Sequence, residues 1–230
     1  MVDKRMMIEC VQLLEAVRNV IPENPGIPVE RVQSFLTSRL SLGIVELTRD
    51  YANHKNTLST RARAVMARTV FEGSTRILSA LKSGELALSI YHASNKEDLK
   101  RCRQLDEVEP APDGSYDRVR VMIEDKLKSV EESFPNFKPR KLSAFSLAKE
   151  SGFERHYRAL YFELSRYVHH NPHAISDDDD PSFAKELEVF VVTACCAAAE
   201  GIARHYQHPA TAQIVREAHA LVDWAEGNCA

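Results

Sequence analysis

Arginine and glutamate residues recur at helical spacing in one segment of the chain, and these residue types suit ionic chemistry. Arg61, Arg68, Glu72 and Arg76 fall within about 80° of one another on a helix, opposite its apolar face. One interpretation is an exposed ladder of ion pairs worth a few tenths of a kcal/mol each. The alternative is a guanidinium held by a carboxylate, which is rigid enough to bind phosphate or to orient a catalytic group. We predict that this stripe lies against a second helix, expected over residues 153–170.

That second helix carries a polar row of its own. Tyr161 should face the core, whereas Ser165 and His169 should lie along the edge of the buried face. The helix then ends in His169-His170-Asn171-Pro172-His173, and four aspartates follow at 177–180. A histidine in this position can cap a helix, bind a metal or act as a general acid or base. The spacing matches no closed metal site, so we assign no metal ligands.

Two segments of the chain carry a family resemblance. They are Ala67-Arg-Thr-Val-Phe-Glu-Gly73 and Tyr161-Phe-Glu-Leu-Ser-Arg-Tyr-Val-His-His-Asn-Pro172. Together they resemble a bacterial all-helical family catalogued only as a domain of unknown function, whose pattern pairs an R-x-x-x-E helix with a later Y-x-x-L-S-x-x-V-H segment. The resemblance runs in order over about residues 30–205. It implies a polar centre and brings no activity with it; the implied members are Arg68, Glu72, Tyr161, Ser165 and His169.

The histidine-rich segment also has six residues between Arg166 and His173, with Tyr167 after the arginine. In this it is distantly similar to HEPN domains, helical bundles that often act as metal-independent ribonucleases. Their signature is an Arg followed after four to six residues by a His, although the Asn that commonly follows the Arg is Tyr167 here. The resemblance implies Arg166 and His173 as catalytic residues, with His169, which the first family implies, as the alternative histidine. Histidine would then move protons at the ribose 2′-OH and the leaving group, while arginine stabilises the phosphorane charge. It further implies RNA as a partner and a site shared across a homodimer.

Composition and missing motifs exclude several other classes. The 230 residues hold 30 Lys+Arg against 33 Asp+Glu, and a net charge of −3 argues against a large sequence-independent nucleic-acid surface. No phosphate-cradling glycine motif, G-x-S-x-G or H-E-x-x-H occurs. The longest apolar run, 189–199, is too short to cross a membrane, and the N-terminus leads into no signal-peptide core. We therefore expect a cytoplasmic protein without membrane contact.

The cysteines have a simpler interpretation. They are five in number, include the adjacent pair Cys195-Cys196, and form no C-x-x-C motif. An odd number with this spacing indicates neither a disulfide framework nor a zinc site. We expect reduced residues that pack in the core.

Apolar residues recur with a period of about 3.6 along most of the chain, and capping residues mark the ends of the segments. The predicted helices span 3–21, 28–53, 58–82, 85–106, 116–133, 153–170, 181–207 and 209–226, with a single short turn at 143–150. In the helix of 116–133 the expected buried stripe includes Val119, Met122 and Ile123. No segment alternates with period two, and no linker is long enough to separate two domains. We predict an all-α single domain over residues 1–230, built as a bundle of seven or eight helices.

Three functional hypotheses remain. The favoured one is a bacterial helical-bundle protein with a binding or scaffolding role, whose binding residues are Arg68, Glu72, Arg76, Tyr161 and Ser165. The second is a HEPN-like metal-independent ribonuclease that acts as a toxin or defence effector. The third is a metal-dependent hydrolase built on the histidines and aspartates of the segment after residue 168. The sequence does not decide whether the protein is an enzyme, and we expect no cofactor.

Overall fold

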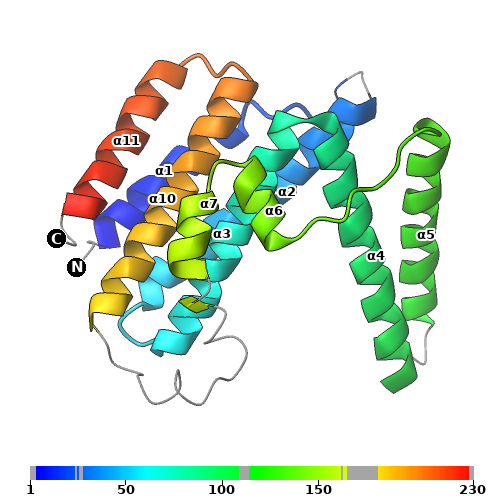
Figure 1. Cartoon of the computed structure of the whole chain (residues 1–230), viewed down its shortest axis with the longest axis horizontal. Coiled ribbons are helices and arrows are strands. Elements are labelled where there is room, and N and C mark those ends of the chain that lie inside the picture. Colours follow the sequence, from blue (N-terminus) through cyan, green and yellow to red (C-terminus); the bar gives the residue numbers. More distant parts are fainter. Residues whose placement is uncertain are drawn as a thin grey trace.

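The computed structural model of the chain describes residues 4–23, 25, 28–108, 114–161, 163–164 and 181–227. Within these ranges every regular element is a helix and none is a strand, which confirms the predicted all-α class. None of these helices is long and apolar enough to cross a bilayer. Figure 1 shows the elements, which in chain order are α1 (Lys4–Arg18), α2 (Pro28–His54), α3 (Thr60–Lys82), α4 (Gly84–Val108), α5 (Ser115–Ser133), α6 (Ala144–Glu150), α7 (Glu154–His156), η1 (Tyr157–Tyr161), α10 (Pro181–His205) and α11 (Thr211–Gly227).

Helices α3 and α10 form the centre of the bundle. The two pack against each other, α2 covers another side of α3, and α1 and α11 cover α10. Small residues permit this close approach, because Ala194, Ala198 and Ala199 of α10 are fully buried and Gly201 faces Leu78 at a point where a Cβ would overlap it. The core thus runs along the α3–α10 contact, and polar residues at its edge are held by rigid helices.

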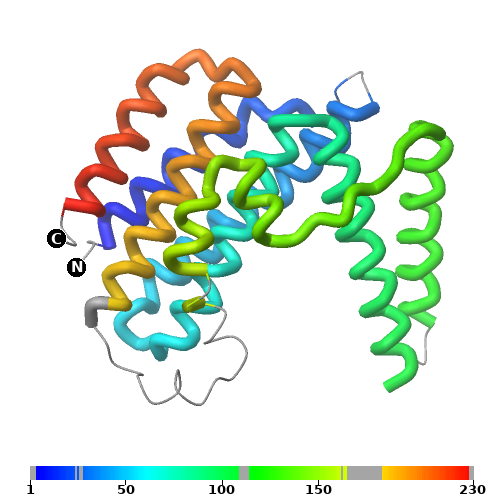
Figure 2. The backbone as a smooth tube through the Cα atoms, viewed as in Figure 1, coloured from blue at the N-terminus to red at the C-terminus, as the bar shows by residue number. Residues whose placement is uncertain are grey.

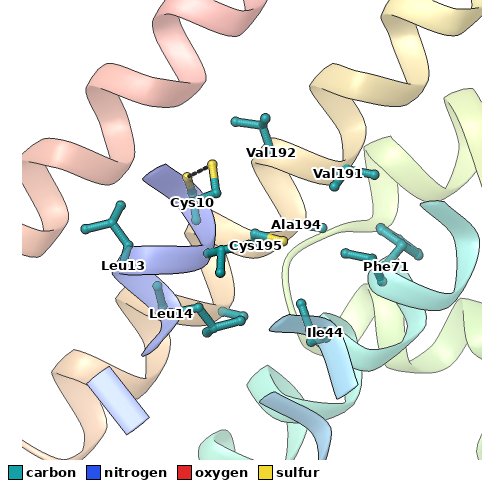
Figure 3. Close-up of a cluster of buried hydrophobic side chains, with 14 of the residues drawn as sticks. Cys10, Leu13, Leu14, Ile44, Phe71, Val191, Val192, Ala194 and Cys195 are labelled. Carbon is teal, nitrogen blue, oxygen red and sulfur yellow. Dashed lines mark hydrogen bonds between the residues drawn. The ribbon is translucent and has the colours of Figure 1, made fainter. Parts of the chain in front are cut away.

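The cysteines of this core behave as packing residues, as predicted. Cys10 of α1 and Cys196 of α10 are buried with their sulfur atoms 3.7 Å apart, and Figure 3 draws this contact beside Cys10. Cys195 lies against the Thr48 hydroxyl at 3.3 Å. Burial raises the pKa of the Cys195 thiol to about 12, so it stays protonated at neutral pH.

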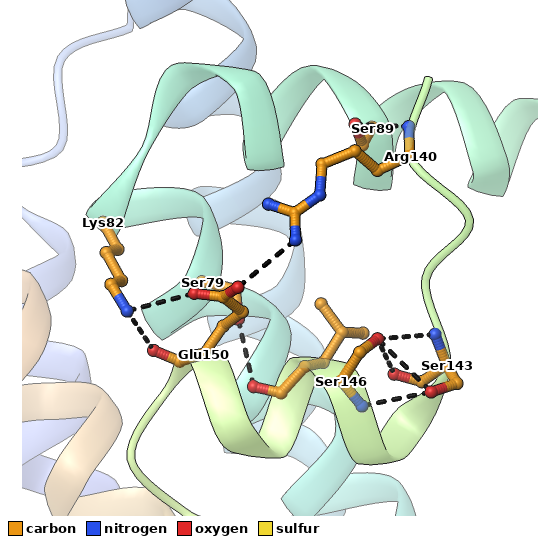
Figure 4. A network of polar contacts seen from close by, with 8 residues as sticks. Ser79, Lys82, Ser89, Arg140, Ser143, Ser146 and Glu150 are labelled. Atoms are coloured by element: carbon orange, nitrogen blue, oxygen red, sulfur yellow. Dashed lines mark hydrogen bonds and ion pairs between the residues drawn. The ribbon is translucent and has the colours of Figure 1, made fainter. Parts of the chain in front are cut away.

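Helix α6 ties the segment before the candidate site to α3 and α4 (Figure 4). Its N-terminus is a capping box in which the Ser143 and Ser146 hydroxyl oxygens each accept the other residue's backbone N–H, at 3.1 and 2.8 Å. At its other end the Glu150 carboxylate accepts hydrogen bonds from Lys82 at 3.1 Å and Arg140 at 3.3 Å. These contacts fix the path by which the chain reaches α7 and η1.

Helices α4 and α5 form a hairpin that extends to one side of the bundle (Figure 2). Helix α5 packs on α4, and its buried residues are Ile123 and Val130. Val119 and Met122 were expected in the same buried stripe, but their exposed fractions are 38% and 49%. That part of the prediction was wrong, because a single neighbouring helix covers only a narrow face and Met122 lies about 100° around the helix from Ile123.

The segment expected as a regular α-helix over 153–170 differs in its first turns. A short α-helical turn, α7, passes directly into the π-helical turn η1. The wider turn coincides with a stack of the Tyr157 and Tyr161 rings, whose centroids are 4.4 Å apart, and with contacts from Tyr161 to α3. Since π-helical turns are rare and are frequent at functional sites, this departure singles out Tyr161.

Candidate functional site

The polar stripe of α3 forms a connected ionic group around Glu72. The Nε–H of Arg68 donates to Glu72 Oε1 at 2.9 Å, and Arg76 Nη2 lies 3.6 Å from Glu72 Oε2. These three residues are one helical turn apart, so the α-helix itself places them in line. The side chains of Arg68 and Glu72 are only 21% and 23% exposed, whereas that of Arg76 is 41% exposed. The simple exposed ladder is therefore the wrong interpretation for the Arg68–Glu72 pair.

Tyr161 joins this group from a different part of the chain. Its hydroxyl donates to Glu72 Oε1 at 2.6 Å, and the Arg68 guanidinium carbon lies 4.9 Å from the centre of its ring. The ring is held from below by Phe71, at 5.9 Å between centroids, and Phe71 itself stacks on Phe190 of α10 at 4.6 Å. The prediction that the stripe lies against the segment beginning at residue 153 is confirmed. We call Arg68, Glu72, Arg76 and Tyr161 the polar centre.

The electrostatics of the polar centre keep each group in one protonation state at neutral pH. Burial acts to raise the pKa of Glu72, but the hydrogen bonds from Tyr161 and Arg68 and the charge of Arg76 outweigh it, so this pKa lies below its ordinary value. Burial, followed by the hydrogen bond to the Glu72 carboxylate, raises the pKa of the Tyr161 hydroxyl. Glu72 is thus an anion and Tyr161 a hydrogen-bond donor throughout the physiological range.

Arg68 has a hydrogen-bond donor that the described residues around it do not satisfy. Its Nη1 atom is buried and has no hydrogen-bond partner in the described part of the chain. A buried donor without a partner costs about 1–3 kcal/mol, and a planar guanidinium satisfies such donors best with a phosphate or carboxylate. With Arg76 one further turn along and partly exposed, the polar centre carries two cations against one anion. It is therefore suited to bind an anionic group.

The remaining predicted site residues cannot be placed beside it. Ser165, Arg166, His169 and His173 lie outside the described residues, as do the four aspartates at 177–180. Across the parts of the chain that are described, no three His, Cys, Asp or Glu side chains gather where they could hold a metal ion. The catalytic assignment and the metal-hydrolase hypothesis both stay predictions.

A second buried ionic contact went unnoticed in the sequence. Lys55, just after α2, donates to Glu188 of α10 at 3.0 Å, and their side chains are only 9% and 3% exposed. The neighbouring hydroxyl of Tyr51 is buried too, and burial together with the Glu188 charge raises its pKa. Glu188 stands directly before the apolar run at 189–199, and this position could have indicated a buried carboxylate. Its partner Lys55 could not be identified from the sequence, because it lies 133 residues away in the chain. This pair joins the segment that follows α2 to helix α10.

The fold and the polar centre define the class of protein: an all-α bundle in which helix α3 shares an ionic group with a later aromatic segment. More particularly, the chain belongs to a family described as "Family of unknown function (DUF5677)", whose model matches residues 47–183, more than half of the chain. The matched range includes α3 and Tyr161, and so the whole polar centre. No curated protein and no solved structure matches the chain.

Proposed function

We propose that the protein is a binding protein whose polar centre receives a phosphate-bearing ligand, and that RNA is its partner. In this proposal Arg68 contacts the phosphate directly, Arg76 adds a second charge, and Glu72 and Tyr161 are positioning residues. The observation that carries the proposal is the buried Nη1 of Arg68 without a partner in the described residues, on a guanidinium already fixed through Nε by Glu72.

Pre-organisation favours this role over a purely structural one. The Arg68 side chain is held by a hydrogen bond to Glu72 and by the Tyr161 ring. Ligand binding therefore costs little side-chain conformational entropy. Guanidinium groups bind phosphate oxygens in pairs of parallel hydrogen bonds, and such charge-assisted bonds are about twice as strong as neutral ones. A site of this kind tracks the backbone of RNA without reading its bases.

The experiment is a fluorescence anisotropy titration with a labelled single-stranded RNA, repeated with inorganic phosphate as competitor. Arg76→Gln should weaken RNA binding by about tenfold or more, since one charged hydrogen bond contributes roughly 1.5–3 kcal/mol. The matched control is Arg204→Gln. Arg204 lies on α10 and, like Arg76, is paired with a glutamate four residues away, Glu200, at 2.7 Å. Equal losses in both variants, or no binding of RNA or phosphate to the wild type, would overturn the proposal.

One observation favours a second candidate function, the HEPN-like ribonuclease. Tyr161 is anchored on Glu72 by a 2.6 Å hydrogen bond only five residues before Arg166, so the polar centre fixes the start of the segment that carries the predicted catalytic residues. In this hypothesis RNA cleavage persists in EDTA and leaves 2′,3′-cyclic phosphate or 3′-phosphate ends. Arg166→Ala and His173→Ala should each abolish it, and His169→Ala tests which histidine acts. Cleavage that stops in EDTA would point to a metal site instead.

A further inference from the structure

The outer face of α5, the side turned away from α4, is the surface of most interest outside the polar centre. We define it by Arg118, Val121, Met122 and Asp125. Figure 1 shows α5 at the edge of the molecule, with α4 between it and the rest of the bundle. Val121 and Met122 are 52% and 49% exposed, and the open surface around them is lined by α5 residues alone.

Along α5, the positive and negative side chains of this face lie on opposite sides of its two apolar residues. The two apolar residues lie at its centre, with Arg118 about one turn before them and Asp125 about one turn after them. Arg118 and Asp125 are seven residues apart and so point within about 20° of each other. A cation and an anion therefore lie about 5 Å on either side of the point between Val121 and Met122.

We propose that the outer face of α5 binds the same face of a second copy of this chain, with the two α5 helices antiparallel. A two-fold axis between Val121 and Met122 sets Arg118 of each chain against Asp125 of the other. The same axis sets Val121 of each chain against Met122 of the other and buries four apolar side chains together. An interface of this kind is self-complementary, as a two-fold dimer requires.

Charge complementarity is what selects a second copy as the occupant. An unrelated partner would need only some arrangement of charges, whereas this face carries opposite charges in pairs at equal distances from its apolar centre, Arg118 with Asp125 and Asp117 with Lys126. The contact is small, because one helix against one helix buries less than the roughly 1,200 Å² typical of a stable complex. Dimers should accordingly form at micromolar or higher concentration and weaken as salt is added.

The test is sedimentation velocity over a concentration series, with circular dichroism to verify folding of each variant. Wild type should show reversible monomer–dimer exchange. Arg118→Asp and Asp125→Arg should each weaken the dimer by at least about tenfold, because each sets like charges opposite each other at both ends. The double variant R118D/D125R should regain the dimer. The matched controls are Arg216→Asp and Asp223→Arg, exposed changes of the same charge on α11, which should leave it unchanged.

Mixing the two single variants gives the decisive result. Arg118→Asp leaves an excess of anions on this face and Asp125→Arg an excess of cations, so an equimolar mixture should form heterodimers at concentrations where neither variant dimerises alone. A wild type that stays monomeric at the highest concentration it tolerates would overturn the proposal. So would a dimer that these variants do not affect, or a mixture that remains monomeric.

Discussion

Replacing Glu72 with Ala removes an acceptor that several side chains share. Arg68 Nε and the Tyr161 hydroxyl lose hydrogen bonds of 2.9 and 2.6 Å, and Arg76 loses its ion-pair partner at 3.6 Å. Hydrogen bonds to a charged group contribute roughly 1.5–3 kcal/mol each. The Glu72 side chain keeps 23% of its exposure, and the Arg76 contact is long and open to solvent, so only the first two bonds count, at a discount. We expect a loss of about 2–4 kcal/mol in the free energy of unfolding.

Urea unfolding followed by far-ultraviolet circular dichroism measures this loss. The matched control is Glu9→Ala, since Arg5 and Glu9 form an i,i+4 pair with the same 2.9 Å separation but with side chains 82% and 40% exposed. Its loss should be about 0.3–0.5 kcal/mol. Glu72→Gln retains an acceptor oxygen and should lose less than Glu72→Ala. If Glu72→Ala costs no more than Glu9→Ala, the polar centre contributes nothing beyond a surface pair and the reasoning fails.

Three further predictions concern the polar centre and the buried Lys55–Glu188 pair. Tyr161→Phe keeps the ring against Arg68 but removes the hydroxyl, so it should destabilise by about 1–2 kcal/mol in urea unfolding; an unchanged midpoint would contradict this. The pKa of Glu72 is lowered in the folded protein, so its stabilisation is complete above roughly pH 4.3 and is lost as the pH falls through the folded value. In thermal melts the melting temperature of Glu72→Gln should therefore fall less steeply with decreasing pH than that of wild type. Parallel declines of the two melting temperatures would contradict this prediction. Lys55→Met should cost about 3–5 kcal/mol, because it leaves the 3% exposed Glu188 carboxylate without its partner, and adding Glu188→Leu should restore most of the loss; chemical denaturation showing no recovery in the double variant would count against the buried-pair account.

Most of the fold was predictable because local signals and burial agree. The apolar period of α3 sets Val70, Phe71 and Ile77 on one side, and these are the residues that the core buries. The ionic stripe of α3 was visible for the same reason, since residues one turn apart share a helix face in any context.

The structural features that the sequence did not predict depend on contacts between residues far apart in the chain, or on how many helices pack against a given helix. The π-helical turn at Tyr157–Tyr161 arises where ring stacking and the Glu72 hydrogen bond outweigh regular helix geometry, and neither contact is encoded within the turn. The Lys55–Glu188 pair joins residues from two separate helical regions. Met122 has the periodicity of a buried residue, but among the described helices α4 alone packs closely on α5, so its exposure follows from tertiary arrangement rather than from sequence.

Binding of an anionic group by Arg68 and Arg76 can be followed at the two guanidinium groups themselves by side-chain nuclear magnetic resonance. Arginine Nε–Hε signals of the ¹⁵N-labelled protein are followed while inorganic phosphate, and then a short RNA, is added; Arg68→Lys and Arg76→Gln assign the two signals. We predict that the Arg68 and Arg76 signals shift first and saturate together, while that of Arg204, an exposed paired arginine on α10, moves little. Uniform shifts across all exposed arginines, or none at Arg68, would contradict the account.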